Sequence, residues 1–240
     1  MPKQRVDRKR LLKEPDEFIT TTMRAMAWLR RNSRWVTAGV IAVLVTGVAF
    51  WGWRVYQTRK EFNAQDMLSQ AYRLYAKAIH EDSGSDSQDL LSKAVERLQA
   101  VTIQFPGTRA AWMAMLYRGR ALCALGRYQE AQEVFEVALG SAPSGDDGTM
   151  RGLAIMGLGQ AHAANGQWQE AASAFERLRS EGGGAFSRLA EWELARCYEQ
   201  QGRSQEAAVL YESLLAKVSE PLEREMIQSR LSGLAQAEVK

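Results

Sequence analysis

The sequence is poor in the residues that mark β structure, disulfide frameworks and metal sites. Only five of its 240 residues are proline, and strongly alternating apolar stretches are absent, which argues against a β-rich fold. Its two cysteines, Cys123 and Cys197, form no C-x-x-C pair, so the sequence supports neither a zinc site nor a redox motif. We expect both to be small buried apolar residues rather than partners in a disulfide.

Residues that carry catalytic chemistry are equally sparse. The two histidines, His80 and His162, have no metal-like spacing, and His162 holds the repeat position that Tyr198 fills in the next unit. We therefore interpret His162 as a packing residue. Residues 182–184 are three glycines between two expected helices, where a flexible linker is the plain interpretation. The sequence predicts no enzyme, and we expect no catalytic residue, metal ligand or cofactor.

Charge is unevenly distributed along the chain. Residues 1–34 hold ten Lys and Arg against four Asp and Glu, whereas residues 54–240 hold 21 against 24. A basic head on a mildly acidic body indicates two environments rather than one basic binding protein.

The 19 residues from Trp35 to Trp53 carry no charge at all. As a helix they extend roughly 28 Å, close to the thickness of a bilayer's hydrocarbon core. Arg34 and Arg54 flank the stretch, and tryptophans at both ends suit the membrane interface. A buried core helix and a cleaved signal peptide are the alternatives. Because Phe50–Trp53 makes a poor peptidase site, we predict an uncleaved signal anchor.

Positive charges set the expected orientation of this span. The basic residues near the span are Arg24, Arg30, Arg31 and Arg34 before it and Arg54, Arg59 and Lys60 after it. The tail adds Lys3, Arg5, Arg8, Lys9, Arg10 and Lys13. We therefore expect the N-terminus in the cytoplasm and the large C-terminal part on the other side.

The basic tail has two parts of its own. Residues 3–13 form a polybasic cluster, in which each Lys or Arg near an anionic leaflet contributes about 1 kcal/mol of attraction. Residues 16–32 predict a helix with one apolar face, made of Phe18, Ile19, Thr22, Met23, Met26 and Ala27. This helix could lie among lipid headgroups, dock on a cytoplasmic partner, or lie at the surface without a partner.

A short phrase occurs three times further along the chain. It spans Gly126–Phe135, Gly166–Phe175 and Gly202–Tyr211, with starts 40 and then 36 residues apart. A period of this size is typical of stacked supersecondary units, none of which can bury its apolar face alone.

The phrases resemble tetratricopeptide repeats, which are helix–turn–helix units. The small residue of the second helix is Ala131, Ala171 or Ala207, and the aromatic four residues later is Phe135, Phe175 or Tyr211. A fainter copy keeps Ala94, Leu98, Val101 and Pro106, and Pro143 ends the second helix of a later unit. The sequence departs from the motif at Met115, Ile155 and Glu191, where a large aromatic is usual, and at 182–184.

These patterns predict an all-α fold: one transmembrane helix, then a tetratricopeptide-type α-solenoid of about four helix pairs with a C-terminal capping helix. The expected parts are a tail (1–34), a span (35–53) and a repeat domain (54–240), with units at 61–107, 108–145, 149–183 and 185–221. We expect the span to continue as one long helix ending near the loop at 82–87. The capping helix shares a face of Leu222, Met226, Ile227, Leu231 and Leu234.

The repeat resemblance also implies where partners bind. In this family an inner groove is lined by first-helix residues at recurring offsets. Carried onto this sequence, the positions are Met113, Leu116, Arg120, Leu153, Met156, Gln160, Leu189, Trp192 and Arg196. Met adapts to varied partners, and Trp and Arg are favoured interface anchors. The alternative for the apolar members is ordinary packing between helices.

The order of tail, span, repeats and cap resembles the YfgM-like group of single-pass bacterial inner-membrane proteins, which are ancillary subunits of the SecYEG translocon. This resemblance implies a periplasmic repeat domain whose partners are translocon subunits, periplasmic chaperones or exported clients. A structural scaffold for one envelope assembly, such as the division or cell-wall machinery, is the alternative. No nucleic-acid partner is expected.

Overall fold

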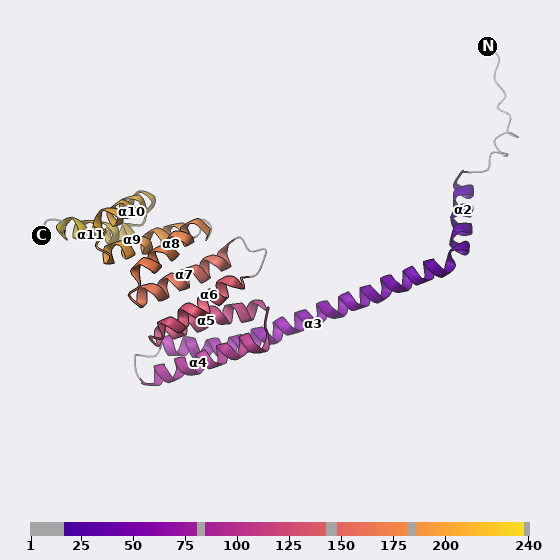
Figure 1. Ribbon diagram of the computed structural model, residues 1–240, viewed down its shortest axis with the longest axis horizontal. Coiled ribbons are helices and arrows are strands. Elements are labelled where there is room, and N and C mark those ends of the chain that lie inside the picture. The colour runs from indigo at the N-terminus through magenta and orange to yellow at the C-terminus, as the bar shows by residue number, and fades with distance from the viewer. Residues whose placement is uncertain (1–16, 81–84, 143–147, 182–185, 238–240) are drawn as a thin grey trace, which may run out of the picture. The chain divides into compact units, whose positions relative to one another are not determined.

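The computed structural model describes residues 17–80, 85–142, 148–181 and 186–237. Within these ranges every regular element is an α-helix, in agreement with the predicted all-α class (Figure 1). The chain divides into two compact units, residues 1–58 and 59–240. The polybasic cluster, Pro143 and the glycine run at 182–184 lie outside the described residues.

The first unit contains α2 (Glu17–Arg31) and the beginning of α3 (Ser33–His80). Both confirm the predicted helices, including the single long helix, which ends at His80. The apolar stretch of α3 satisfies its own polar groups. The hydroxyl of Thr37 donates to the carbonyl of Ser33 at 2.7 Å, and that of Thr46 donates to Ala42 at 2.9 Å. Polar groups bonded within the helix suit a segment surrounded by hydrocarbon.

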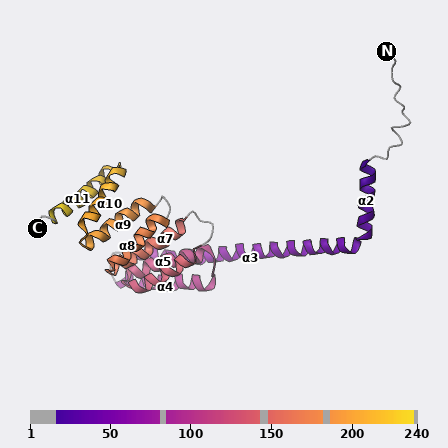
Figure 2. The same ribbon diagram turned by 45° about the horizontal axis from the view of Figure 1, so that its top comes forward.

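The second unit is a succession of antiparallel helix pairs. Its helices after α3 are α4 (Ser85–Gln104), α5 (Arg109–Ala124), α6 (Tyr128–Gly140), α7 (Thr149–Ala164), α8 (Trp168–Glu181), α9 (Ser187–Gln200), α10 (Ser204–Lys217) and α11 (Pro221–Ala237). From α4 on, each helix packs against the next, which is the nearest-neighbour arrangement of a solenoid (Figure 2). The four predicted units and the final helix are therefore present. Residues 85–87, expected in a loop, already belong to α4.

The last part of α3 serves as the first helix of the first predicted repeat, residues 61–107. Its residues Ala64, Leu68 and Ala71 are buried with Leu98 of α4 and Ala114 of α5 in one core cluster. Polar contacts add to this packing. The Glu61 carboxylate accepts hydrogen bonds from the amides of Arg109 and Ala110, both at 3.0 Å, at the N-terminus of α5. These amides have no partner within their own helix, so α3 caps α5.

The thrice-repeated phrase builds the turn and the core of each unit. Gly126, Gly166 and Gly202 have φ of 73°, 75° and 72°, a left-handed conformation that glycine adopts without strain. The small and aromatic residues of the second helices are all buried, which confirms their predicted packing role. Phe135 shows how tight this packing is. A Cβ added to Gly119 or Gly157 would lie only 2.5 Å or 2.3 Å from its ring.

The three departures from the motif have different outcomes. Ile155 is fully buried in the core and simply replaces the aromatic. Met115 is only partly buried and lines a cavity. Glu191 is a buried carboxylate, and Lys217 of α10 binds it with 2.8 Å hydrogen bonds to both oxygens.

The two cysteines and His162 are at least partly buried among the helices. Cys123 and Cys197 are free thiols, partly and fully buried respectively, as the sequence led us to expect. His162 is half-buried, and its Nδ1 lies 2.8 Å from Oε1 of Gln167, which follows the glycine of the same turn.

Candidate protein-binding surface

The nine predicted groove residues lie on three first helices, α5, α7 and α9. Arg120, Gln160, Leu189 and Arg196 are exposed, and Met113, Leu153 and Trp192 are partly buried. The remaining two are different. Leu116 and Met156 are members of the hydrophobic core with little surface left, the alternative that the sequence analysis left open.

Two tyrosines extend this row of side chains onto α3, where they meet Tyr117 of α5. The ring centroids of Tyr72 and Tyr117 are 4.8 Å apart, and Tyr75 lies 5.9 Å from Tyr117. Burial raises the pKa of Tyr75 above its ordinary value, while the nearby Arg120 opposes that shift. The cluster therefore brings three phenol rings close to the guanidinium of Arg120.

The sequence analysis missed these tyrosines, although a signal for Tyr72 was present. Arg120, Gln160 and Arg196 each follow directly after the small residue at the crossing of two helices, namely Gly119, Gly159 and Ala195. In the first repeat, residues 61–107, the equivalent small residue is the buried Ala71, and Tyr72 follows it. This position could not be assigned in the first repeat from the sequence, because the repeated phrase that marks the turn of the later repeats is absent there.

We call the resulting row the first-helix surface. Its members are Tyr72, Tyr75, Met113, Tyr117, Arg120, Leu153, Gln160, Leu189, Trp192 and Arg196. The row is continuous: tyrosine rings join α3 to α5, α5 contacts α7, and a cavity of about 260 Å³ joins Gln160 of α7 to Arg196 of α9.

The C-terminal end of this surface holds an apolar recess. Leu189 and Trp192 of α9 face Met226 and Ile227 of α11 across a cavity of about 260 Å³. The Trp192 ring meets the buried ring of Tyr211 edge-on, with centroids 5.4 Å apart. This contact fixes the indole in a well-packed position, which is the usual situation of an interface anchor.

Two ion pairs place arginine side chains at the surface near the recess. Arg196 bonds Glu193 at 2.9 Å, and Arg230 of α11 lies 3.5 Å from Glu199. The carboxylates of both pairs are much less exposed than the arginines. The positive ends of these pairs therefore face solvent, and they could bond carbonyls or carboxylates of a bound chain.

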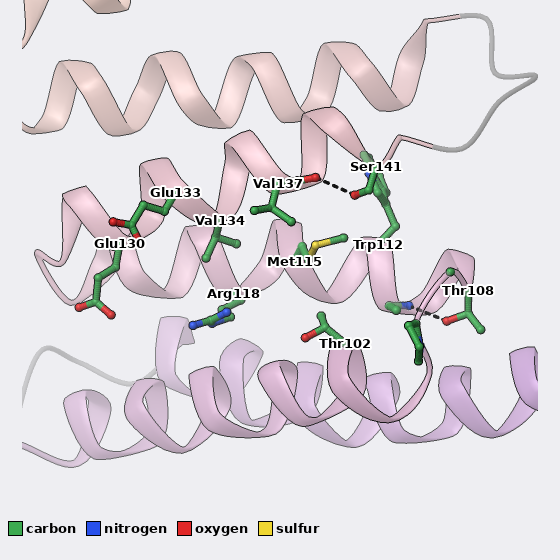
Figure 3. Close-up of a pocket in the computed structure, with 13 residues that line it drawn as sticks. Thr102, Thr108, Trp112, Met115, Arg118, Glu130, Glu133, Val134, Val137 and Ser141 are labelled. Carbon is green, nitrogen blue, oxygen red and sulfur yellow. Dashed lines mark hydrogen bonds between the residues drawn. The ribbon is translucent and has the colours of Figure 1, made fainter.

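A larger cavity of about 510 Å³ lies between α4, α5 and α6, among residues that the sequence analysis did not select (Figure 3). Trp112, Met115 and Val134 contribute apolar side chains, and Arg118 lies at one end near Glu130. The indole Nε1 of Trp112 donates to the carbonyl of Ala138 at 2.8 Å, so this ring is held firmly. Nε of Arg118 is buried and has no hydrogen-bond partner among the described residues, and desolvation lowers the pKa of Arg118. The sequence did hold one indication of this cavity, because Met115 stands where the repeat motif has a large aromatic residue.

Two observations bear on the metal and thiol chemistry of these surfaces. Among the described residues no three His, Cys, Asp or Glu side chains gather as a metal site would require. Burial raises the pKa of both Cys123 and Cys197 to about 11, so the thiols remain protonated at neutral pH and are poor nucleophiles.

Comparisons with known proteins agree with this architecture. The sequence profile of the tetratricopeptide repeat-like domain family matches residues 26–236. A Podosopora anserina putative kinesin light chain protein with nearly identical TPR-like repeats has 24% identity and a TM-score of 0.58, over 74% of this chain and 88% of that one. A tetratricopeptide repeat protein from Parabacteroides merdae has 14% identity and a TM-score of 0.56, over 72% and 60%. MamA from Desulfovibrio magneticus RS-1 has 13% identity and a TM-score of 0.50, over 72% and 96%. At such identities the likeness concerns the fold alone. No curated protein matches the sequence significantly.

Proposed function

Because this chain belongs to the tetratricopeptide repeat-like domain family, we propose that it is a membrane-anchored module that binds other proteins through its first-helix surface. The observation that carries the proposal is the continuous row of tyrosine, methionine, leucine, tryptophan and arginine side chains on consecutive first helices. Aromatic and arginine residues are the side chains most often found as energetic anchors of protein interfaces.

A membrane anchor is supported by the apolar stretch of α3. Its 18-residue window of highest hydropathy has no buried residue within the described structure, whereas the core helix of a soluble protein would be mostly covered. In our proposal this segment crosses the bacterial inner membrane once. The N-terminus is cytoplasmic and the repeat domain is periplasmic, as the distribution of Lys and Arg favours.

The partners we propose are translocon subunits, periplasmic chaperones or exported envelope proteins in an unfolded state. The YfgM-like resemblance of the sequence supports this choice. Tethering next to the site where clients leave the membrane would raise the effective concentration of the binding surface. The first-helix surface suits extended or helical segments, because it combines an apolar recess at Leu189 and Trp192 with a second cavity lined by Gln160 and Arg196.

One observation favours the alternative of a scaffold for a single envelope assembly. The cavity between α4, α5 and α6 is formed by second helices as well as first, and it is separate from the first-helix surface. A protein with two separate binding sites could hold two subunits together. Purification in mild detergent separates the alternatives: many weakly held clients indicate a client-binding factor, and one stoichiometric complex indicates a scaffold.

Crosslinking in intact membranes tests the proposed surface. A photoreactive amino acid replaces Trp192 in one variant and the exposed Val209 of α10 in a control variant. We expect envelope or translocon proteins to be captured from position 192 and identified by mass spectrometry, with much less capture from position 209. Equal capture from both positions would contradict the proposed surface. A reporter fused after Lys240 tests the orientation, and activity only in the cytoplasm would overturn it.

A further inference from the structure

Helix α2 has an apolar side that nothing in the described part of the chain covers. Met23, Met26 and Leu29 recur at intervals of three residues and are 65%, 70% and 51% exposed. Three such side chains on one face of a 15-residue helix are more than isolated surface residues, because they form a single stripe. A stripe of this kind is stable in water only when something apolar covers it.

The opposite side of α2 is basic. At 100° per residue, Arg24 lies 160° and Arg31 lies 140° around the helix from Met26. Trp28 is 60% exposed and lies 160° from Met26, on the same side as Arg24, whereas Arg30 lies only 40° from Met26, within the stripe. A helix with an apolar stripe on one side and basic residues on the other is suited to lie in the plane of a membrane interface, where the long side chain of Arg30 can reach past the stripe to the headgroups.

The chain itself places a bilayer within reach of this helix. Only Asn32 stands between α2 and α3, and the charge-free stretch begins at Trp35. The amide of Asn32 donates to the carbonyl of Trp28 at 2.9 Å, and Val36 donates to Asn32 at 3.0 Å. Asn32 therefore bonds to both helices, and Leu29 stands only six residues before Trp35.

We propose that α2 lies on the anionic surface of the bilayer that α3 crosses, with Met23, Met26 and Leu29 among the acyl chains and Arg24 and Arg31 at the lipid phosphates. Charge supports a lipid rather than a protein surface as the cover. The tail up to residue 34 has ten basic residues against four acidic ones, which complements an anionic leaflet. The inference rests on the proposed span, and it adds a second membrane contact to it.

Spin labels on the full-length protein test this position. The cysteine-free background is Cys123→Ala with Cys197→Ala, and the single-label variants are Met26→Cys, Arg24→Cys and Val43→Cys. Each is reconstituted into nanodiscs of phosphatidylcholine with phosphatidylglycerol. Power saturation compares collisions with oxygen, which concentrates in lipid, and with a water-soluble nickel chelate. We expect the label at 26 to collide mainly with oxygen and the label at 24 mainly with nickel. In phosphatidylcholine alone, the preference at 26 should weaken.

The label at position 43 distinguishes failure of the proposed span from failure of the proposed position of α2. If position 43 meets nickel, the span itself is absent and the proposed anchor fails. If position 43 meets oxygen but positions 24 and 26 are equally open to nickel, only the interfacial position of α2 is overturned. If position 26 is shielded from both reagents, a protein covers the stripe, and the lipid proposal is likewise overturned.

Discussion

Lys217 and Glu191 form an ion pair that joins the last residue of α10 to the interior of α9. Nζ of Lys217 lies 2.8 Å from each carboxylate oxygen, and the Glu191 side chain is 10% exposed against 46% for the lysine. The Glu191 carboxylate stands where the repeat motif has an aromatic residue. Its buried charge is compensated by Lys217 of the next helix.

Removing that cation should destabilise the last repeat. Lys217→Met leaves a buried carboxylate unpaired, and we expect a loss of roughly 2 kcal/mol, less than for a fully buried pair because the lysine is half-exposed. Lys93→Met is the matched control, since its ion pair with Asp89 is exposed on both sides and its loss should change stability far less. Urea unfolding of both variants measures the difference. Equal losses would show that the Glu191 pair has no special role.

The ring of Phe135 leaves no room beside Gly157. We expect Gly157→Ala to destabilise the fold by roughly 1–3 kcal/mol, because the added methyl group overlaps a ring that is itself fully buried. Gly233→Ala provides the control. A Cβ there meets nothing within 4 Å, and alanine should stabilise the exposed helix α11 by up to about 1 kcal/mol. We expect the melting temperature to fall for Gly157→Ala and to rise for Gly233→Ala. A higher melting temperature for Gly157→Ala would contradict the packing.

The cap that Glu61 provides for α5 can be tested in the same way. Glu61→Ala leaves the amides of Arg109 and Ala110 without their acceptor and removes a negative charge from a helix N-terminus. We expect a loss of about 1 kcal/mol. Glu96→Ala, an exposed substitution on α4, should stay within about 0.5 kcal/mol of the unchanged protein. Hydrogen exchange should report faster opening at the start of α5 in the first variant alone.

Thiol chemistry should depend strongly on pH. Burial raises the pKa of Cys123 and Cys197 from 9.0 to about 11, so the folded state disfavours the thiolates. We expect alkylation of the folded protein to be slow at neutral pH and to rise as the pH approaches 11. The same shift means that the thiols contribute stability below pH 9, which is lost as the pH rises through the folded pKa. Rapid alkylation at neutral pH without unfolding would contradict this.

Much of this architecture could be predicted from the sequence because its signals are local. The glycine, alanine and aromatic of each phrase lie within ten residues, and their roles follow from helix geometry. The long α3 followed from uninterrupted apolar spacing. Helical periodicity also gave the first helices that carry the proposed surface.

The missed features depend on contacts between distant residues. Glu191 and Lys217 are 26 residues apart, and nothing in the local sequence pairs them. Leu116 and Arg120 lie one helical turn apart on α5, yet the first is buried and the second exposed, because the neighbouring helices cover only part of that face. The cavity beside Met115 likewise depends on how α4 and α6 approach α5.

The sharing of α3 between the apolar stretch and the first repeat limits how the repeat domain could be released by proteolysis. Glu61 caps α5, and Ala64, Leu68 and Ala71 belong to the core of the first unit. A protease that cut after these residues would strip one wall from the fold and expose the apolar faces of α4 and α5. Intact shedding therefore requires cleavage between Trp53 and Glu61, a window of seven residues that is helical and resists proteases without local unwinding.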